Sequence, residues 1–194
     1  MLGLLTPTDV RWVAAAEEDL PGLLSDHAHC ELKAAVAALS LVSRFGAQHP
    51  SMIEPLSALA QEETAHFRAV SAQLVERGAT LGRCDADGYV NALWDFTKPE
   101  RARIPVLLDR LLVNALVEAR SCERFKLLSE HLVDPSLSRF YRGLMESEAR
   151  HYRLFCGLSE ELFGVKLARE RLVELAQREA KVAEKLPLGP KVHG

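Results

Sequence analysis

The sequence contains few of the residues that favour β-sheets or that form domains stabilised by disulfide bonds. Aromatic residues make up only 6% of its 194 positions, while Ala, Leu, Glu and Arg are abundant, a mixture that favours helices over strands. Its four cysteines include no Cys-x-x-Cys pair and form no Cys/His set spaced as in a zinc site. A disulfide framework is not expected at this length, so this cysteine usage is typical of a reducing cytoplasm.

Long apolar runs and a strong charge of either sign are also lacking. No run approaches the roughly 18 apolar residues that span a bilayer, and the first residues lack the basic and apolar regions of a secretory signal. The net charge of −3 argues against indiscriminate affinity for nucleic acid, although it does not exclude a local basic patch. We therefore expect a cytoplasmic protein with no membrane span.

Proline and glycine divide the chain into segments whose apolar residues have helical spacing. Four long helices are predicted over about residues 23–45, 52–77, 105–132 and 136–162, with shorter ones over about 8–18, 89–94 and 168–185. Residues 79–103 are less regular and are predicted to form a crossover between two helix pairs. The sequence thus predicts an all-α fold: a four-helix bundle with a mid-chain crossover and additional short helices. It is expected to be one domain over residues 1–194, with a flexible tail from about 186.

The second helix of each pair carries the same short motif. Glu-x-x-His followed by an aromatic residue and an Arg occurs in QEETAHFR and again in ESEARHYR. Three residues along an α-helix bring two side chains to one face, about one turn apart. Apolar residues flank these faces, so Glu63 and His66, like Glu148 and His151, are predicted to point inward. A buried carboxylate is costly unless it is paired, protonated or bound to a metal.

The remaining ligands follow from the chemistry of metal-binding bundles. Di-iron and di-manganese bundles use one Glu from each of two helices and a Glu-x-x-His from each of the other two. In the first helix pair, Glu31 is the only acid in the segment HAHCELKAAVAALSL. The second pair offers Glu118 or Glu123. Glu118 is preferred because its interval to Glu148 matches the first pair better and because it lies on a more apolar stripe.

The predicted site therefore contains four carboxylates and two imidazoles, whose negative charges match two divalent cations: Glu31, Glu63, His66, Glu118, Glu148 and His151. Such ligands suit iron or manganese better than metals that prefer thiolates. His27 and His29 flank Glu31, and neither is predicted to be a ligand, although His27 has the spacing to support Glu31. Cys30 and Cys122 are interpreted as small core residues.

Four longer strings resemble the MiaE family of tRNA 2-methylthio-isopentenyl-adenosine hydroxylases, within the ferritin-like di-iron superfamily: SDHAHCELKAA, LAQEETAHF, LVEARSCERF and ESEARHYRLF. The resemblance runs from about Leu4 to about Lys185, and EARSCERF is its most specific part. It implies a ferritin-like bundle and a monooxygenase that uses two iron ions and O2. The implied reaction is hydroxylation of the isopentenyl group on the adenosine next to a tRNA anticodon. The family's ligand pattern falls on the same six residues, with no catalytic residue beyond them.

The implied reaction also needs partners. No flavin or haem motif is apparent, so electrons are expected from a separate reductase or ferredoxin-like protein. Basic residues in segments 98–110 and 166–194 are candidates for phosphate contact, although ordinary charge pairing on helices explains them as well. Tyr89, Trp94 and Phe96 either stack on a base or cap the core. The oligomeric state stays open, and a monomer is compatible with the sequence.

Three other functions fit part of the pattern. One is a di-iron oxidase or hydroxylase that acts on a small molecule. Another is a manganese catalase or other peroxide-detoxifying bundle. The third is a helical interaction module that binds no metal. Metal content separates the last from the others, and the substrate that is consumed separates the first two from a tRNA hydroxylase.

Overall fold

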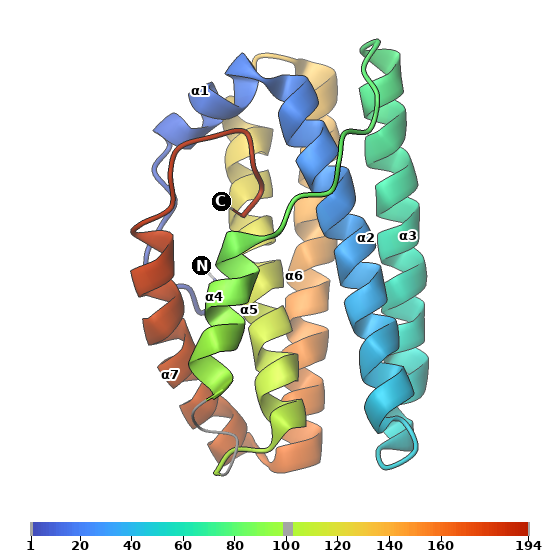
Figure 1. The fold of residues 1–194 in the computed structure, drawn as a ribbon, viewed down its shortest axis with the longest axis vertical. Helices are drawn as coiled ribbons and strands as arrows, with labels where there is room; N and C mark the ends of the chain where they lie inside the picture. The colour runs from blue at the N-terminus through green and yellow to red at the C-terminus, as the bar shows by residue number, and fades with distance from the viewer. Residues whose placement is uncertain (1, 99–102, 194) are drawn as a thin grey trace. The chain divides into compact units, whose positions relative to one another are not determined.

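The computed structural model describes residues 2–98 and 103–193. All regular elements within these ranges are helical, which confirms the predicted all-α composition (Figure 1). Contacts between residues divide the chain into two compact units. Unit 1 comprises Met1–Val13, Asp87–Leu188 and His193–Gly194, and unit 2 comprises Ala14–Ala86 and Gly189–Val192. Helix α1 (Arg11–Glu18) crosses from the first unit to the second. The single domain expected over residues 1–194 stays a prediction.

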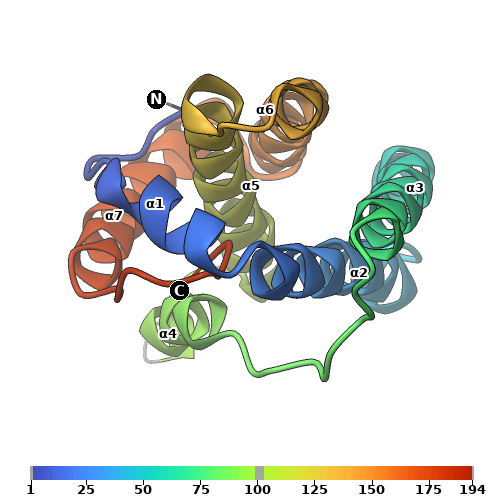
Figure 2. The ribbon, with the colours of Figure 1, turned by 90° about the horizontal axis from the view of Figure 1, so that it is seen from above.

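Unit 2 is a helical hairpin made by α2 (Leu20–Phe45) and α3 (Ile53–Glu76), which lie side by side in Figures 1 and 2. Asp19 caps α2, because its carboxylate accepts the Gly22 N–H at 2.9 Å. The turn between the helices includes the short 3-10 helix η1 (Pro50–Met52). Gly78 ends the hairpin with a φ of 71°, a left-handed conformation that favours glycine. These local signals agree with the predicted helices to within a few residues.

Unit 1 is built around a second hairpin, α5 (Val106–His131) and α6 (Pro135–Phe163), again side by side in both views (Figures 1 and 2). Asp134 caps α6 by accepting the N–H groups of Ser136 and Leu137, and Pro135 occupies the first helical position. Helix α7 (Val165–Ala183) packs on both α5 and α6, and α4 (Gly88–Thr97) packs on α5 and α7. Helix α4 lies in the predicted crossover and is longer than the helix expected over residues 89–94.

Two buried ion pairs join α7 to α5 within unit 1. Arg171 on α7 contacts Asp109 through two nitrogen–oxygen distances of 2.7 and 3.2 Å, and both side chains are almost fully buried. Arg120 on α5 donates to Glu179 on α7 at 2.6 Å, and the Tyr89 hydroxyl donates to the same carboxylate at 2.9 Å. Breaking a buried pair leaves one charge without compensation. These pairs therefore specify how α7 docks on α5.

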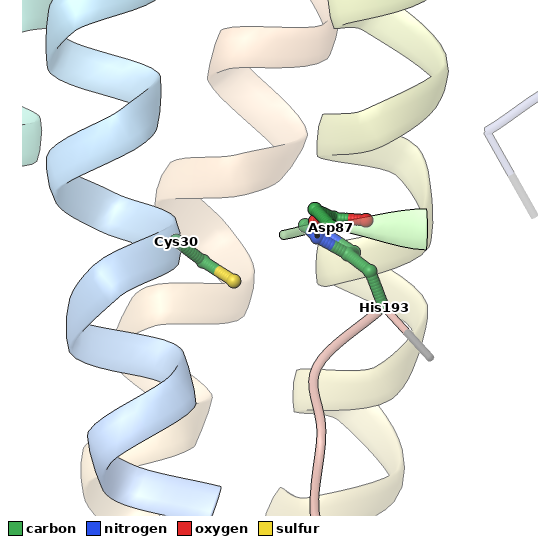
Figure 3. Close-up of side chains that lie close together, drawn as sticks. All are labelled: Cys30, Asp87 and His193. Carbon is green, nitrogen blue, oxygen red and sulfur yellow. Dashed lines mark hydrogen bonds and ion pairs between the residues drawn. The ribbon is translucent and has the colours of Figure 1, made fainter. Parts of the chain in front are cut away.

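The C-terminal segment forms hydrogen bonds within each unit, while the flexible tail expected from about residue 186 stays a prediction. In unit 2, the Val192 N–H donates to Asp26 at 2.8 Å. In unit 1, the buried His193 imidazole lies 3.0 Å from Asp87 and 2.9 Å from the Ser121 hydroxyl. Figure 3 shows His193 and Asp87 side by side. The sequence ends in polar and glycine-rich residues, so the contacts that hold the segment are visible only in the folded chain.

Candidate metal centre

The hairpin of unit 2 brings Glu31 on α2 together with Glu63 and His66 on α3. Nδ1 of His66 lies 3.2 Å from Oε2 of Glu63 and 3.6 Å from Oε2 of Glu31. Both carboxylates are buried, and 13% of the His66 side chain is exposed. One potential ligand atom from each residue lies within 4.8 Å of the others. The sequence placed these three residues on facing helices, and the folded hairpin brings them into contact.

Charge and burial act in opposite directions on this triad. Burial alone would raise the pKa of Glu31, but hydrogen bonds with His27 and His66 outweigh it and hold that pKa well below the usual value. Burial alone would lower the pKa of His66, but the carboxylates of Glu31 and Glu63 raise it to about 9. In the metal-free protein the triad is therefore held together by a protonated imidazole between two carboxylates.

His27 supports Glu31 from within the same helix, four residues before it. Its Nε2 lies 2.5 Å from Oε1 of Glu31, and the imidazole is fully buried. His29 faces elsewhere, where its Nε2–H donates to the Gly82 carbonyl at 2.9 Å. The spacing argument had allowed His27 to face the site without making it a ligand. The structure gives it a positioning role, because it fixes one oxygen of Glu31.

The hairpin of unit 1 repeats the arrangement with Glu118 on α5 and Glu148 and His151 on α6. Nδ1 of His151 lies 3.8 Å from Oε2 of Glu118 and 3.8 Å from Oε1 of Glu148. All three side chains are buried. Potential ligand atoms of the three residues lie within 4.8 Å of one another. Both nitrogen–oxygen distances are longer than a normal hydrogen bond.

The position of Glu123 supports the choice of Glu118. Glu123 accepts hydrogen bonds from the backbone N–H and the hydroxyl of Thr8, at 2.9 and 2.7 Å. It also pairs with the buried Arg120 guanidinium at 2.5 Å. Its carboxylate therefore holds the N-terminal segment onto α5, while Glu118 lies beside Glu148 and His151. The sequence could not show this role, because Thr8 is distant from Glu123 along the chain.

Each triad offers two carboxylates and one imidazole on a buried surface. Two carboxylates balance the charge of one divalent cation, and oxygen with imidazole nitrogen suits iron or manganese. Glu62 and Glu146, the additional acids of the two motifs, are not buried. Cys30 and Cys122 are half-buried, and Cys122 donates to the Met145 carbonyl at 3.4 Å. The donor chemistry of each triad therefore fits one ion of a di-iron or di-manganese site.

The segments considered for phosphate contact are largely engaged within the protein. Lys98 pairs with Asp95, and the Arg110 guanidinium lies 5.4 Å from the centre of the Trp94 ring. Arg101 lies outside the described residues. In the second segment, Arg169 pairs with Glu160 at 2.7 Å. Tyr89 is buried, and Trp94 and Phe96 pack against the same core of unit 1, so these aromatic residues cap the core.

Comparison with known proteins identifies the family. The family model described as tRNA-(ms2io6A)-hydroxylase (MiaE) matches residues 2–194. The chain belongs to the MiaE family. A tRNA 2-(methylsulfanyl)-N(6)-isopentenyladenosine(37) hydroxylase from Pseudomonas putida is 42% identical over 172 residues, covering 88% of this chain and 81% of that protein. The hydroxylase of the same name from Salmonella typhimurium is 30% identical over 205 residues, covering 80% of this chain and 74% of its own.

A solved structure supports the fold class. It is described as protein 43 with aldehyde deformylating oxygenase activity from Synechococcus, and it superposes with a TM-score of 0.89 at 40% identity. The match covers 98% of this chain and 95% of that one. The predicted ferritin-like fold and the predicted enzyme class, a tRNA hydroxylase of the MiaE family, are thus confirmed. Within residues 2–98 and 103–193, no helix is long and apolar enough to cross a membrane.

Proposed function

We propose that this MiaE-family enzyme is an O2-dependent, non-haem di-iron monooxygenase. Its substrate is the 2-methylthio-isopentenyl-adenosine next to the anticodon of tRNA, and it hydroxylates the isopentenyl group. The observation that carries the proposal is the repetition of one donor set on both helical hairpins. The chain buries two sets of two carboxylates and one imidazole, and it belongs to a family of tRNA hydroxylases. A metal-dependent oxygenase is the function that accounts for both observations most simply.

The proposed ligands are the six residues that the sequence indicated: Glu31, Glu63, His66, Glu118, Glu148 and His151. Together they would hold two iron ions, with both units acting as one ferritin-like domain. Four carboxylates balance the charge of two ferrous ions, and two imidazoles complete a donor set that leaves positions open for O2. The metal pair supplies the oxidising power that no amino-acid side chain provides for an unactivated C–H bond.

The side chains around the ligands have their own tasks. His27 holds one oxygen of Glu31, so the other oxygen keeps a fixed direction toward a metal. The burial of Glu118, Glu148 and His151 excludes water from that triad and strengthens their electrostatic contacts. Metal binding requires the proton on His66 to leave, because only a neutral imidazole nitrogen is a ligand.

An external electron donor belongs to the proposal. Hydroxylation places one oxygen atom of O2 in the product and reduces the other to water, which consumes two electrons for each turnover. A reductase or a ferredoxin-like protein is the expected source, and a tRNA substrate places the reaction in the cytoplasm.

A second candidate is an oxygenase that acts on a small molecule. The observation that favours it is the similarity to the Synechococcus structure, whose description gives aldehyde deformylating oxygenase activity. The two candidates share a fold and a donor set and differ in the substrate that reaches the metal site. A di-manganese, peroxide-consuming enzyme is a further possibility with the same ligands.

One experiment separates these functions. The purified chain is loaded with ferrous iron, its metal content is measured, and it is incubated with reductant, 18O2 and tRNA that carries the unhydroxylated nucleoside. Digestion and mass spectrometry should then show one labelled oxygen atom on that nucleoside. Parallel reactions contain a long-chain aldehyde or hydrogen peroxide.

Matched variants on α3 serve as controls. Glu63→Ala should lose iron and activity, while Glu54→Ala, on the exposed face of the same helix, should keep both. An unchanged nucleoside with an enzyme that holds two irons and consumes aldehyde would overturn the tRNA proposal in favour of the small-molecule reaction.

A further inference from the structure

Helix α6 carries the proposed ligands on one face and a band of arginines on the opposite face. Arg139, Arg142, Arg150 and Arg153 are exposed, and the only acid among them is Glu146. With about 100° per residue, these positions fall within a stripe roughly 100° wide. Glu148 and His151 lie on the opposite side of the same helix. We call the five exposed residues the arginine stripe.

Three of the four arginines in the stripe have no carboxylate partner among the described residues. Arg139, Arg142 and Arg153 form no ion pair with any residue in the ranges 2–98 and 103–193. Arg150 donates to the Ser147 hydroxyl at 2.8 Å. By contrast, Lys98 and Arg169 in the segments first considered for phosphate contact are paired with carboxylates. The stripe therefore attracts a polyanion electrostatically.

A hollow of about 390 Å³ adjoins the stripe at the seam between α5 and α6. Cys122, Met145 and Ala149 provide small or apolar walls, and Glu146, Arg150 and Arg153 provide a charged rim. Cys122 is one helical turn from Glu118, and Ala149 directly follows Glu148. An unstacked base with its phosphates needs such a combination of apolar walls and guanidinium groups.

Two glycines on the same exposed side of α6 support a close approach from outside. A Cβ at Gly143 or Gly157 would meet no atom within 4 Å beyond its chain neighbours and the adjacent helix backbone, so packing against other elements does not require glycine at either position. Glycine weakens a helix interior. Its presence here leaves the backbone of α6 accessible beside the arginines, where a nucleic-acid strand can lie close to the helix.

We propose that the arginine stripe and the adjoining hollow bind the phosphate backbone of the anticodon arm of the tRNA substrate. This inference rests on the proposed function, because it assumes that tRNA is the substrate. One guanidinium group can donate two parallel hydrogen bonds to the oxygens of a phosphate. Such contacts position a nucleic acid without reading its sequence. The hollow receives an unpaired loop nucleotide beside the stripe, next to the helix that carries Glu148 and His151.

The test compares two charge-reversed proteins with the same change in net charge. In the stripe variant, Arg142→Glu is combined with Arg153→Glu. In the control, Lys181→Glu in the last turn of α7 is combined with Lys185→Glu just beyond its end, and both positions are exposed. Each iron-loaded protein is titrated into a fluorescent anticodon stem-loop RNA at several salt concentrations. Iron content and helical circular dichroism verify that the variants fold.

We expect the Kd of the stripe variant for the RNA to rise at least tenfold. The plot of the logarithm of its binding constant against the logarithm of salt concentration should become less steep by about two. The control should stay within about twofold of the wild type. Equal binding by the stripe variant and the wild type would overturn the proposal, and so would equal losses in both variants, which would indicate only a general charge effect.

Two further measurements separate this inference from the function on which it rests. Hydroxylation of the free modified nucleoside by the wild type measures activity at the metal site without phosphate contacts, since that substrate has no phosphate. If the wild type binds the RNA through the stripe but hydroxylates neither tRNA nor nucleoside, the proposed function fails while the binding surface stands. If the stripe variant keeps RNA binding and instead loses reduction by a reduced ferredoxin, the stripe docks an acidic electron donor and the proposal is wrong.

Discussion

The His27 imidazole lies with Nε2 2.5 Å from Oε1 of Glu31, and both side chains are buried on α2. In the metal-free protein, this contact fixes the position of one oxygen of the buried Glu31 carboxylate. We predict that His27→Leu weakens ferrous-ion binding by about 10- to 100-fold, the usual effect of removing a residue that orients a metal ligand. Iron titration of the metal-free protein measures the change. His29→Leu is the control, and an equal loss in that variant would show that His27 has no specific role.

Glu118 and Glu123 offer a direct test of the ligand choice. Glu118→Ala should lower the iron content, because it removes a carboxylate from the buried triad of unit 1. Glu123→Ala should keep its iron but lower the free energy of unfolding by about 1–3 kcal/mol, since Thr8 and the buried Arg120 lose an acceptor. Iron analysis and urea denaturation measure the two effects. Iron retained by Glu118→Ala and lost by Glu123→Ala would reverse the assignment.

The buried Arg171–Asp109 pair should contribute strongly to the docking of α7 on α5. Asp109→Ala removes the carboxylate that contacts the buried Arg171 guanidinium, so the free energy of unfolding should fall by about 3–5 kcal/mol. The double variant Asp109→Leu, Arg171→Met should recover much of this loss, because it removes both charges. Glu170→Ala, an exposed position on α7, should change stability by less than about 0.5 kcal/mol. Additive losses in the double variant would contradict this account.

The stability of the metal-free protein should depend on pH through His66. Its pKa in the folded state is about 9, above the ordinary value of 6.5, because Glu31 and Glu63 favour the protonated imidazole. The resulting stabilisation is complete below pH 6.5 and is lost as the pH rises through about 9. Urea midpoints of the metal-free protein should therefore fall across this interval, and those of His66→Gln should fall less. Parallel curves for the two proteins would exclude the contribution of His66.

Much of the fold was predictable because local signals on this chain agree with one another. Asp134 with Pro135, and Gly78, mark helix ends that the structure places within a few residues of the predictions. The Glu-x-x-His motifs were recognisable because helical periodicity alone brings both side chains of each motif to one face. The preference for Glu118 was also available, since the interval between two ligands on adjacent helices is set by the length of the hairpin.

The roles of other charged residues were not predictable, because their partners are distant along the chain. Arg120, Glu179 and Tyr89 form one buried network in unit 1, although the sequence alone shows a charged C-terminal helix. His193 contacts Asp87 and Ser121 across a long separation in sequence. Contacts of this kind depend on the docking of elements, for which no periodic pattern exists.

By itself, the sequence determined an all-α chain with two helical hairpins and a pair of inward-facing Glu-x-x-His motifs, because helix formation and helix faces follow from residues within a few positions of one another. Only the tertiary structure decided which charges are buried, that His27 holds Glu31, that Glu123 is committed to Thr8 and Arg120, and that the arginines of α6 remain on the surface. Burial and ion pairing arise when separate elements meet, so they are properties of the packed chain.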